Sequence, residues 1–167
     1  MKELKPVLVC FLLISANCFC QKLHNADDLN RFFSDMLDSI NAKHIAWASE
    51  LNNAEKTGSY LNVKVRRLEI EEMLDNYDKA VTETKDISGS ANFKKTMMNY
   101  IAYEKNLVNS NYIPFESLKS TSSQSEKDRL EHSLEVAAQD EKTELDKVKK
   151  AQKEYGTKNS LEGVDDN

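Results

Sequence analysis

The stretch from Asn25 to Glu55, NADDLNRFFSDMLDSINAKHIAWASELNNAE, decides the fold class. Asn25 can cap the N-terminus of a helix, and Asp27 and Asp28 suit the positive first turn that follows. The large apolar residues recur every three or four positions, which places them on one face of an amphipathic helix. They are Leu29, Phe33, Met36, Ile40, Trp47 and Leu51. The sequence therefore predicts a helix over 25–55 that must bury this face against other elements.

Three clusters of turn-forming residues divide the following chain, at 56–59, 87–90 and 120–123. Gly58 and Gly89 suit the left-handed backbone position just after a helix end. The intervals 59–86, 90–119 and 123–156 repeat the three-and-four spacing, so each predicts one further helix. The expected core positions are Leu61, Val65, Leu68, Met73, Leu74, Tyr77 and Val81, then Phe93, Met97, Ile101, Val108, Tyr112, Phe115 and Leu118, then Leu130, Leu134, Ala137, Ala138, Leu145, Val148 and Tyr155.

The third helix contains Pro114, which removes a backbone donor and crowds the preceding turn, so we expect a kink near it. Ser123 to Glu126 has the pattern of a capping box and predicts the start of the fourth helix. Short loops between helices of similar length favour antiparallel neighbours. The sequence therefore predicts an all-α, up-down-up-down four-helix bundle over 21–156 and a disordered polar tail over 157–167. The alternative is two long hairpins that pair with another chain.

Composition supports this class and excludes others. The whole chain has four glycines and two prolines, too few for the frequent turns of a β-sandwich. Its formal net charge is −5 and it has no basic run, so we expect no nucleic-acid partner. An acidic chain is also repelled by an anionic membrane surface.

The first twenty residues have the pattern of a secretory signal peptide. Lys2 and Lys5 precede an apolar run, Val7 to Ile14, which is followed by small or polar residues. The run is too short for a bilayer-spanning helix, which needs roughly 20 residues. We therefore predict that 1–20 is cleaved and that the protein is exported, to the periplasm, the cell envelope or the outside of a bacterial cell.

All three cysteines lie in this segment, at Cys10, Cys18 and Cys20. Cleavage after Cys20 would leave a mature chain without a thiol, and so without a disulfide or a cysteine metal site. The alternative is lipoprotein processing with a lipid on Cys18, because Ser15-Ala16-Asn17-Cys18 loosely resembles that cleavage pattern. In that case the N-terminal lipid would be the protein's contact with the membrane.

Four polar residues near the middle of the helices form a candidate cation site. His44, Glu72, Glu104 and Glu141 fall on or near the apolar stripes, one in each predicted helix. In an antiparallel bundle they would come to one layer, where carboxylates and an imidazole can bind a divalent cation. The simpler interpretation, which we favour, keeps the glutamates at the edge of the core with their charges in water.

The aromatic residues allow a similar choice. Trp47, Tyr100, Tyr103 and Tyr112 could line a ligand pocket, which would open near the kink in the third helix. Aromatic residues at helical spacing are more often part of the core, and we favour that interpretation. The charged run from Arg66 to Glu72 is typical of a solvated helix face with local ion pairs.

Signatures of catalysis are missing from the sequence. It has no glycine-rich phosphate loop, no His-Glu-x-x-His and none of the Glu-x-x-His pairs of a di-iron bundle. The chain, with its signal-like start, Gln21 and an acidic four-helix body, resembles small exported bacterial surface or envelope proteins. This resemblance implies no catalytic or binding residue. We therefore expect a non-enzymatic protein without a cofactor that contacts an envelope protein or itself. The alternative is a periplasmic bundle that binds a small ligand or cation.

Overall fold

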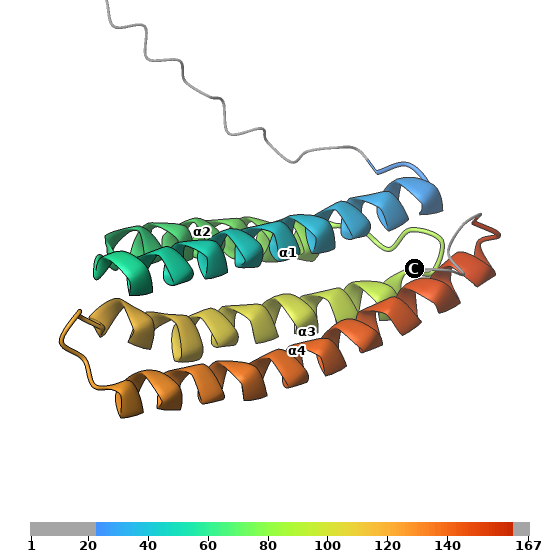
Figure 1. The fold of residues 1–167 in the computed structure, drawn as a ribbon. Coiled ribbons are helices and arrows are strands. Elements are labelled where there is room, and N and C mark those ends of the chain that lie inside the picture. Colours follow the sequence, from blue (N-terminus) through green and yellow to red (C-terminus); the bar gives the residue numbers. More distant parts are fainter. Residues whose placement is uncertain (1–22, 162–167) are drawn as a thin grey trace, which may run out of the picture.

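The computed structural model describes residues 23–161, and four long helices dominate this part of the chain (Figure 1). The predicted signal peptide, with Cys18, lies outside the described residues. The helices are α1 (Ala26–Thr57), α2 (Leu61–Glu83), α3 (Ala91–Leu107) and α4 (Gln124–Lys158). A π-helix, η1 (Val108–Tyr112), and a 3-10 helix, η2 (Ile113–Ser117), continue directly from α3. The predicted all-α four-helix bundle is confirmed.

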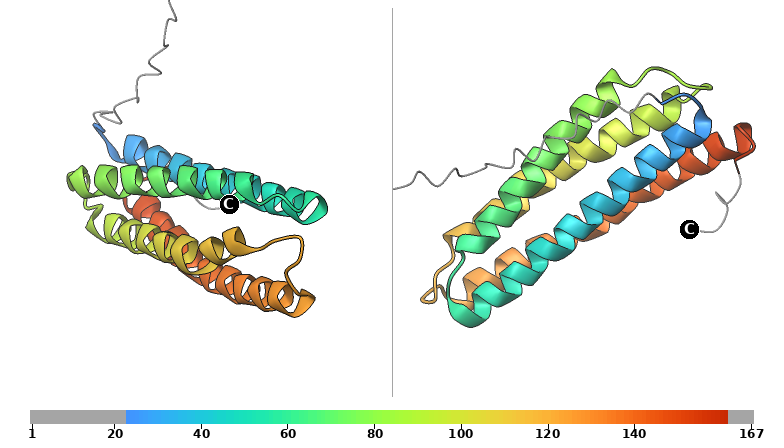
Figure 2. Two further views of the ribbon diagram at one scale, coloured as in Figure 1. Left: turned by 90° about the vertical axis from the view of Figure 1, so that its left-hand side faces the viewer. Right: turned by 90° about the horizontal axis from the view of Figure 1, so that it is seen from above.

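Successive helices run antiparallel and form two layers, α1 with α2 and α3 with α4 (Figures 1 and 2). The end of α4 returns to the start of α1, where Gln152 Nε2 donates to Asn30 Oδ1 at 2.9 Å and to Ser34 Oγ at 2.9 Å. Over the rest of their length α1 and α4 touch far less than α2 and α3 do. The side of the bundle between α1 and α4 is therefore the most loosely packed.

Local signals set the helix ends. The Asn25 side chain accepts a hydrogen bond from the backbone N–H of Asp28 at 2.8 Å, as expected of an N-cap. Gly58 has φ 74° after α1, a backbone conformation that favours glycine. Ser123 Oγ accepts from the N–H of Glu126 at 3.2 Å and starts α4.

The core of α1 agrees with its predicted stripe, but that of α2 agrees only in its second half. Leu61, Val65 and Leu68 are exposed, at 71%, 46% and 46%, whereas the predicted Leu74, Tyr77 and Val81 are buried. The inward face of α2 follows an unbroken three-and-four spacing through the charged residue Arg67. Its buried residues are Val63, Arg67, Ile70, Leu74, Tyr77 and Val81. The prediction for the first half was wrong because it placed Arg67 on the solvated face.

The expected kink is a change of helix type. η1 widens the turn after α3, and Pro114 then lies in the first turn of η2. A missing N–H in the first turn of a helix leaves no intrahelical hydrogen bond unmade, so this is where proline is tolerated. The segment stays packed against α2 and α4.

The predicted start of the disordered tail at Thr157 was wrong. Helix α4 continues to Lys158, because the Asn159 N–H donates to the Tyr155 carbonyl at 3.1 Å. The Leu161 N–H then donates to the Gly156 carbonyl at 3.0 Å, and the Leu161 side chain packs on the core. Residues 162–167 lie outside the described part of the chain.

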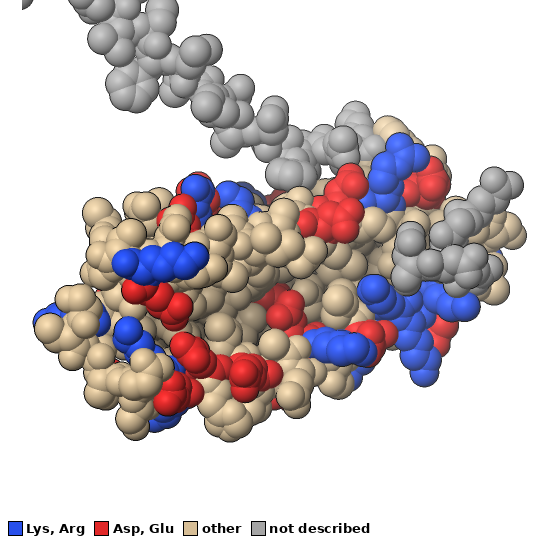
Figure 3. All heavy atoms as spheres, in the orientation of Figure 1, with Lys and Arg blue, Asp and Glu red and all other residues tan. Residues whose placement is uncertain are grey.

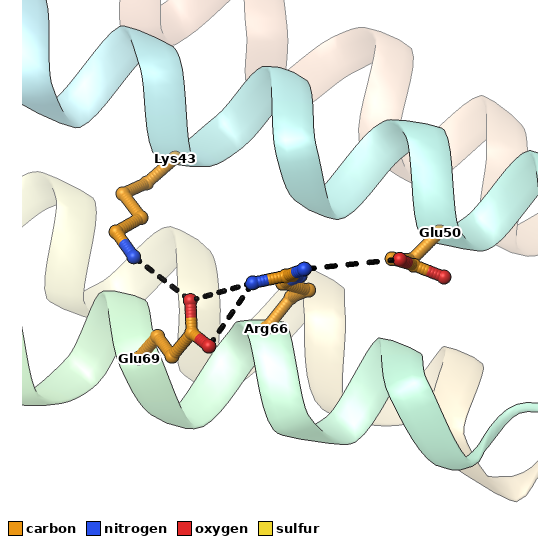
Figure 4. Close-up of polar contacts among 4 residues, drawn as sticks. All are labelled: Lys43, Glu50, Arg66 and Glu69. Atoms are coloured by element: carbon orange, nitrogen blue, oxygen red, sulfur yellow. Dashed lines mark hydrogen bonds and ion pairs between the residues drawn. The ribbon is translucent and has the colours of Figure 1, made fainter.

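Charges are mixed on the face that carries the α1–α4 side of the bundle, without one large patch of either sign (Figure 3). Ion pairs also join neighbouring helices, and Figure 4 shows those between α1 and α2, the two helices of one layer. There Lys43 Nζ lies 2.8 Å from Glu69 Oε2, and Arg66 lies 3.1 Å from Glu69 and 3.9 Å from Glu50. Between residues 23 and 161 no helix has the length and hydropathy needed to span a membrane.

Candidate functional site

A polar cluster lies inside the bundle near the middle of α1. The cluster begins with His44, whose ring sits between α3 and η1. Nε2 lies 3.0 Å from Oε2 of Glu104, and Nδ1 shares a hydrogen bond with the hydroxyl of Tyr112. The π-helix places this hydroxyl, because Tyr112 is its last residue. One imidazole therefore connects a carboxylate on α3 to a phenol at the kink.

Glu104 is the most buried charged residue described, with 0% of its surface exposed. Its Oε2 is within ion-pair distance of His44, but the contact is not aligned as a hydrogen bond, and neither carboxylate oxygen has a hydrogen-bond partner. Burying a carboxylate without hydrogen bonds is costly, and native interiors rarely do so. Glu104 therefore marks a place where the protein carries polarity that folding alone does not require.

A second carboxylate reaches the cluster from α4. Glu141 is partly buried, and its Oε1 lies 3.5 Å from the Tyr100 hydroxyl that donates to it. Burial and the nearby charge of Glu104 raise the pKa of Glu141, while the charge of His44 and the Tyr100 hydrogen bond act in the opposite direction. Glu141 therefore keeps its proton to a higher pH than a carboxyl group in water does.

The phenols keep their protons. Burial, reinforced by the charges of Glu104 and Glu141, raises the pKa of Tyr100 and of Tyr112 well above the ordinary value. Near neutral pH these two phenols are therefore neutral and can donate hydrogen bonds to the carboxylates.

A pocket of about 260 Å³ opens onto this cluster between α1 and α4, and we call it the α1–α4 pocket. Its polar side consists of His44 and Glu141, and Trp47 and Tyr112 supply an aromatic wall. Acidic atoms are visible along this side of the bundle in Figure 3. The remaining lining is apolar: Ile45, Ala48, Leu107, Leu134 and Ala138.

Trp47 anchors the pocket in the core. Its ring stacks on Tyr112 with centroids 3.7 Å apart and planes at 9°, and it meets the edge of Phe115 at 5.6 Å. The side chain is 1% exposed, yet its indole N–H has no hydrogen-bond partner. A buried indole N–H normally finds an acceptor. Trp47 thus lines the α1–α4 pocket and carries a buried N–H without a hydrogen bond.

The structure brings together three of the four candidate cation ligands. Glu72 is separated from His44, Glu104 and Glu141, because it continues the exposed face of α2. It lines a different pocket, together with Lys43 of α1 and other residues of α2. Among residues 23–161 no group of three or more His, Cys, Asp or Glu side chains is placed to hold a metal ion.

The four candidate aromatic residues divide between two pockets. Trp47 and Tyr112 line the α1–α4 pocket, and Tyr100 reaches it through Glu141. Tyr103 instead donates to the Ala137 carbonyl at 2.7 Å and lines a pocket between α3 and α4. Burial and the charge of Asp140 raise the pKa of Tyr103 to about 12.

Two small residues, Ala48 and Ala138, line the pocket from opposite helices, and their short side chains leave the space that larger residues would fill. Ala48 was not singled out from the sequence, and Ala138 was predicted in the core but is exposed at the pocket. Ile45 at the pocket was missed because it lies off the core stripe and is 62% exposed. A hydrophobic residue directly after a core histidine was the one available signal.

Comparison of the chain with protein-family models, with curated proteins and with solved structures gives no match. Inferences about function therefore rest on the site itself.

The raised pKa of Glu141 predicts a pH dependence of stability. The folded state binds the carboxyl proton more tightly than the unfolded chain, whose pKa is near 4.5. The stabilisation from protonated Glu141 is complete below that value and is lost as pH rises through the folded pKa. Glu141→Gln cannot ionise, so we expect it to be more stable than the wild type at pH 7–8, with the difference fading toward pH 4.

Urea unfolding of both proteins between pH 4 and pH 8 measures this difference. Asp140→Asn is the matched control, because the neighbouring side chain is exposed and should give a small difference that does not follow pH. A Glu141→Gln variant less stable than the wild type at pH 8 would contradict the assignment.

Proposed function

We propose that this protein is an exported, non-enzymatic binding protein that takes a small organic molecule into the α1–α4 pocket. The observation that carries the proposal is the pocket itself, which combines apolar walls with a few polar groups at one end. Small-molecule sites have this composition and volumes of roughly 300–1,000 Å³. At about 260 Å³ the α1–α4 pocket lies just below that range, so it suits a compound smaller than the usual drug-sized ligand.

Unsatisfied polar groups support a ligand in this place. The indole N–H of Trp47, Nε2 of His44 and both oxygens of Glu104 are buried without a hydrogen bond. Such groups lower stability unless something pairs with them. His44 and Trp47 line the pocket, where a bound molecule can supply a partner, whereas Glu104 lies behind His44.

Two features of the fold also favour binding at this position. The helices α1 and α4 are the least tightly joined neighbours, so they give a route into the bundle. The π-helix η1 contributes Tyr112 to the pocket, and π-helical turns occur frequently at functional sites. Export to the cell envelope is supported by the signal-like residues 1–20 and by the acidic composition.

A second candidate function is contact with an envelope protein. The exposed stripe of Leu61, Val65 and Leu68 on α2 favours it, because single exposed apolar residues are common but three on one helix face are less so. Recovery of a distinct envelope protein with this chain would support contact as its role. Recovery of the chain alone would count against it.

Fluorescence of the sole tryptophan tests the binding proposal. Because Trp47 lines the pocket, a ligand should change its emission in a saturable way. Ala138→Leu narrows the pocket and should weaken binding at least tenfold. Ala42→Leu makes the same change at an exposed position of α1 and should bind as the wild type does. Equal binding by both variants, or no response to a broad set of small compounds, would overturn the proposal.

A further inference from the structure

The inner end of the α1–α4 pocket has an excess of negative charge. Glu104 and Glu141 supply two carboxylates, and His44 can supply one positive charge when protonated. With all three groups ionised the cluster keeps one uncompensated negative charge in a buried place. Buried charge of this kind is neutralised by a proton or by a cation.

The surrounding elements contribute no second buried cation to this cluster among the residues described. On α2 the buried groups that can ionise are Arg67 and Tyr77, and Arg67 is paired with Glu71 and Glu116. On α3 and η1 the neighbouring groups are the phenols of Tyr100, Tyr103 and Tyr112. Neutral phenols donate hydrogen bonds but do not balance a carboxylate charge.

Free acceptors are available to a positively charged group. Glu141 lines the pocket, and the hydrogen bond it receives from Tyr100 is long, at 3.5 Å. Glu104 lies behind the pocket lining, with its Oε2 3.0 Å from Nε2 of His44, so Glu141 is the carboxylate that a ligand meets. An ammonium group carries up to three donors and no acceptor, which matches this supply of oxygen atoms.

The walls of the pocket suit the rest of such a molecule. Trp47 and Tyr112 present aromatic surface, and aromatic rings attract cations. Leu107 and Leu134 offer apolar surface for an uncharged body. An anion would meet two carboxylates, and an uncharged molecule would leave their charge unbalanced.

We propose that the ligand of the α1–α4 pocket is an organic cation, a protonated amine on a small apolar body, that takes the place of the proton on Glu141. This inference rests on the proposed binding function and names the chemical class of the ligand. The exchange balances, because one positive charge enters the pocket as the ammonium and one leaves Glu141 as a proton to solvent. Below the pH at which Glu141 loses its proton, the cation must therefore compete with that proton.

Three probes of one shape test the class of ligand: benzylamine, benzyl alcohol and benzoate. Titration of the full mature chain at pH 7.5, followed by Trp47 fluorescence and by calorimetry, should show benzylamine binding at least tenfold more tightly than benzyl alcohol. Benzoate should bind most weakly. The heat of benzylamine binding should differ between phosphate and Tris buffers in the sense of proton release, and the affinity should fall on going to pH 5.

Glu141→Gln tests the role of the carboxylate. It should lower the affinity for benzylamine at least tenfold and leave that for benzyl alcohol unchanged, with Asp140→Asn as the matched control that changes neither. Thermal unfolding confirms that each variant is folded. Equal affinity for amine and alcohol, with both lost in Ala138→Leu, would overturn the cation inference and leave the binding function standing. No response of Trp47 to any probe at millimolar concentration would overturn both.

Discussion

Replacing Trp47 by alanine should lower the free energy of unfolding by about 3–5 kcal/mol, the range found when a large buried aromatic residue is truncated. The indole is 1% exposed and lies where α1 meets the kink. It stacks on Tyr112 and contacts the edge of Phe115, and each such aromatic pair adds about 0.5–1.5 kcal/mol beyond area burial. The bundle cannot close fully over the gap, because neighbouring turns of α1 are held by the rest of the core.

Urea unfolding followed by circular dichroism measures this loss, since the substitution removes the fluorescent residue. Ile45→Ala is the control, because it truncates a neighbouring but 62% exposed side chain and should cost far less. Trp47→Phe should fall between the two. A loss below about 1 kcal/mol for Trp47→Ala would show that the indole is not packed in the core.

The helices could be predicted where the hydrophobic spacing is unbroken. In α1 every residue of the predicted stripe is buried, from Leu29 to Leu51, and the cap is the expected Asn25. In α2 the buried face includes Arg67. A search for apolar residues at helical spacing does not count a charged residue, so it misses this face. Two partners make this burial tolerable: Glu71 lies one turn away on α2, whereas Glu116 is distant in sequence and gives no local signal.

The candidate site could be predicted as a layer but not as a pocket. Antiparallel topology brings His44, Glu104 and Glu141 to the same height, and the structure places them together. Which of the four candidate residues meet depends on the direction in which each one points around its helix axis. Glu72 points away from the core of the bundle and lies on the surface. The pocket also depends on the loose packing of α1 against α4 and on the π-helix η1. Both result from the packing of all four helices, so they cannot be predicted from one segment of sequence.

The bundle contains two buried polar clusters of opposite character. Around Arg67 both carboxylates contact the guanidinium directly, because Glu116 is hydrogen-bonded to it and Glu71 lies 2.5 Å from it. Around Glu104 the ion pair is with His44, and a second carboxylate, Glu141, lies close enough for the two charges to interact. Directly paired charges hold elements together, whereas neighbouring carboxylates cost stability when both are ionised. The second cluster is therefore the functional candidate, and the first fixes η2 to α2.

Replacing Arg67 by alanine should cost about 3–5 kcal/mol, because removing one partner of a buried ion pair leaves the other charge without compensation. Arg67 is 7% exposed, and the side chain of Glu116 is 15% exposed. Burial alone would lower the pKa of Arg67, but its hydrogen bonds to Glu116 and Glu71 outweigh burial and raise that pKa, so the guanidinium stays charged. The loss should appear as early unfolding of η2 and the end of α3.

Arg66→Ala is the matched control. Arg66 takes part in the half-exposed network of Figure 4, where its side chain is 39% exposed, so its loss should cost about 0–1 kcal/mol. The double variant Arg67→Met, Glu116→Leu separates charge from packing. Two apolar side chains of similar size can replace a buried ion pair with little loss, so the double variant should regain most of the stability that Arg67→Ala loses. Hydrogen exchange would locate the segment that loses stability. Equal losses of unfolding free energy for Arg66→Ala and Arg67→Ala would contradict the burial of Arg67. Only the removal of a buried partner leaves an uncompensated buried carboxylate, which lowers stability strongly.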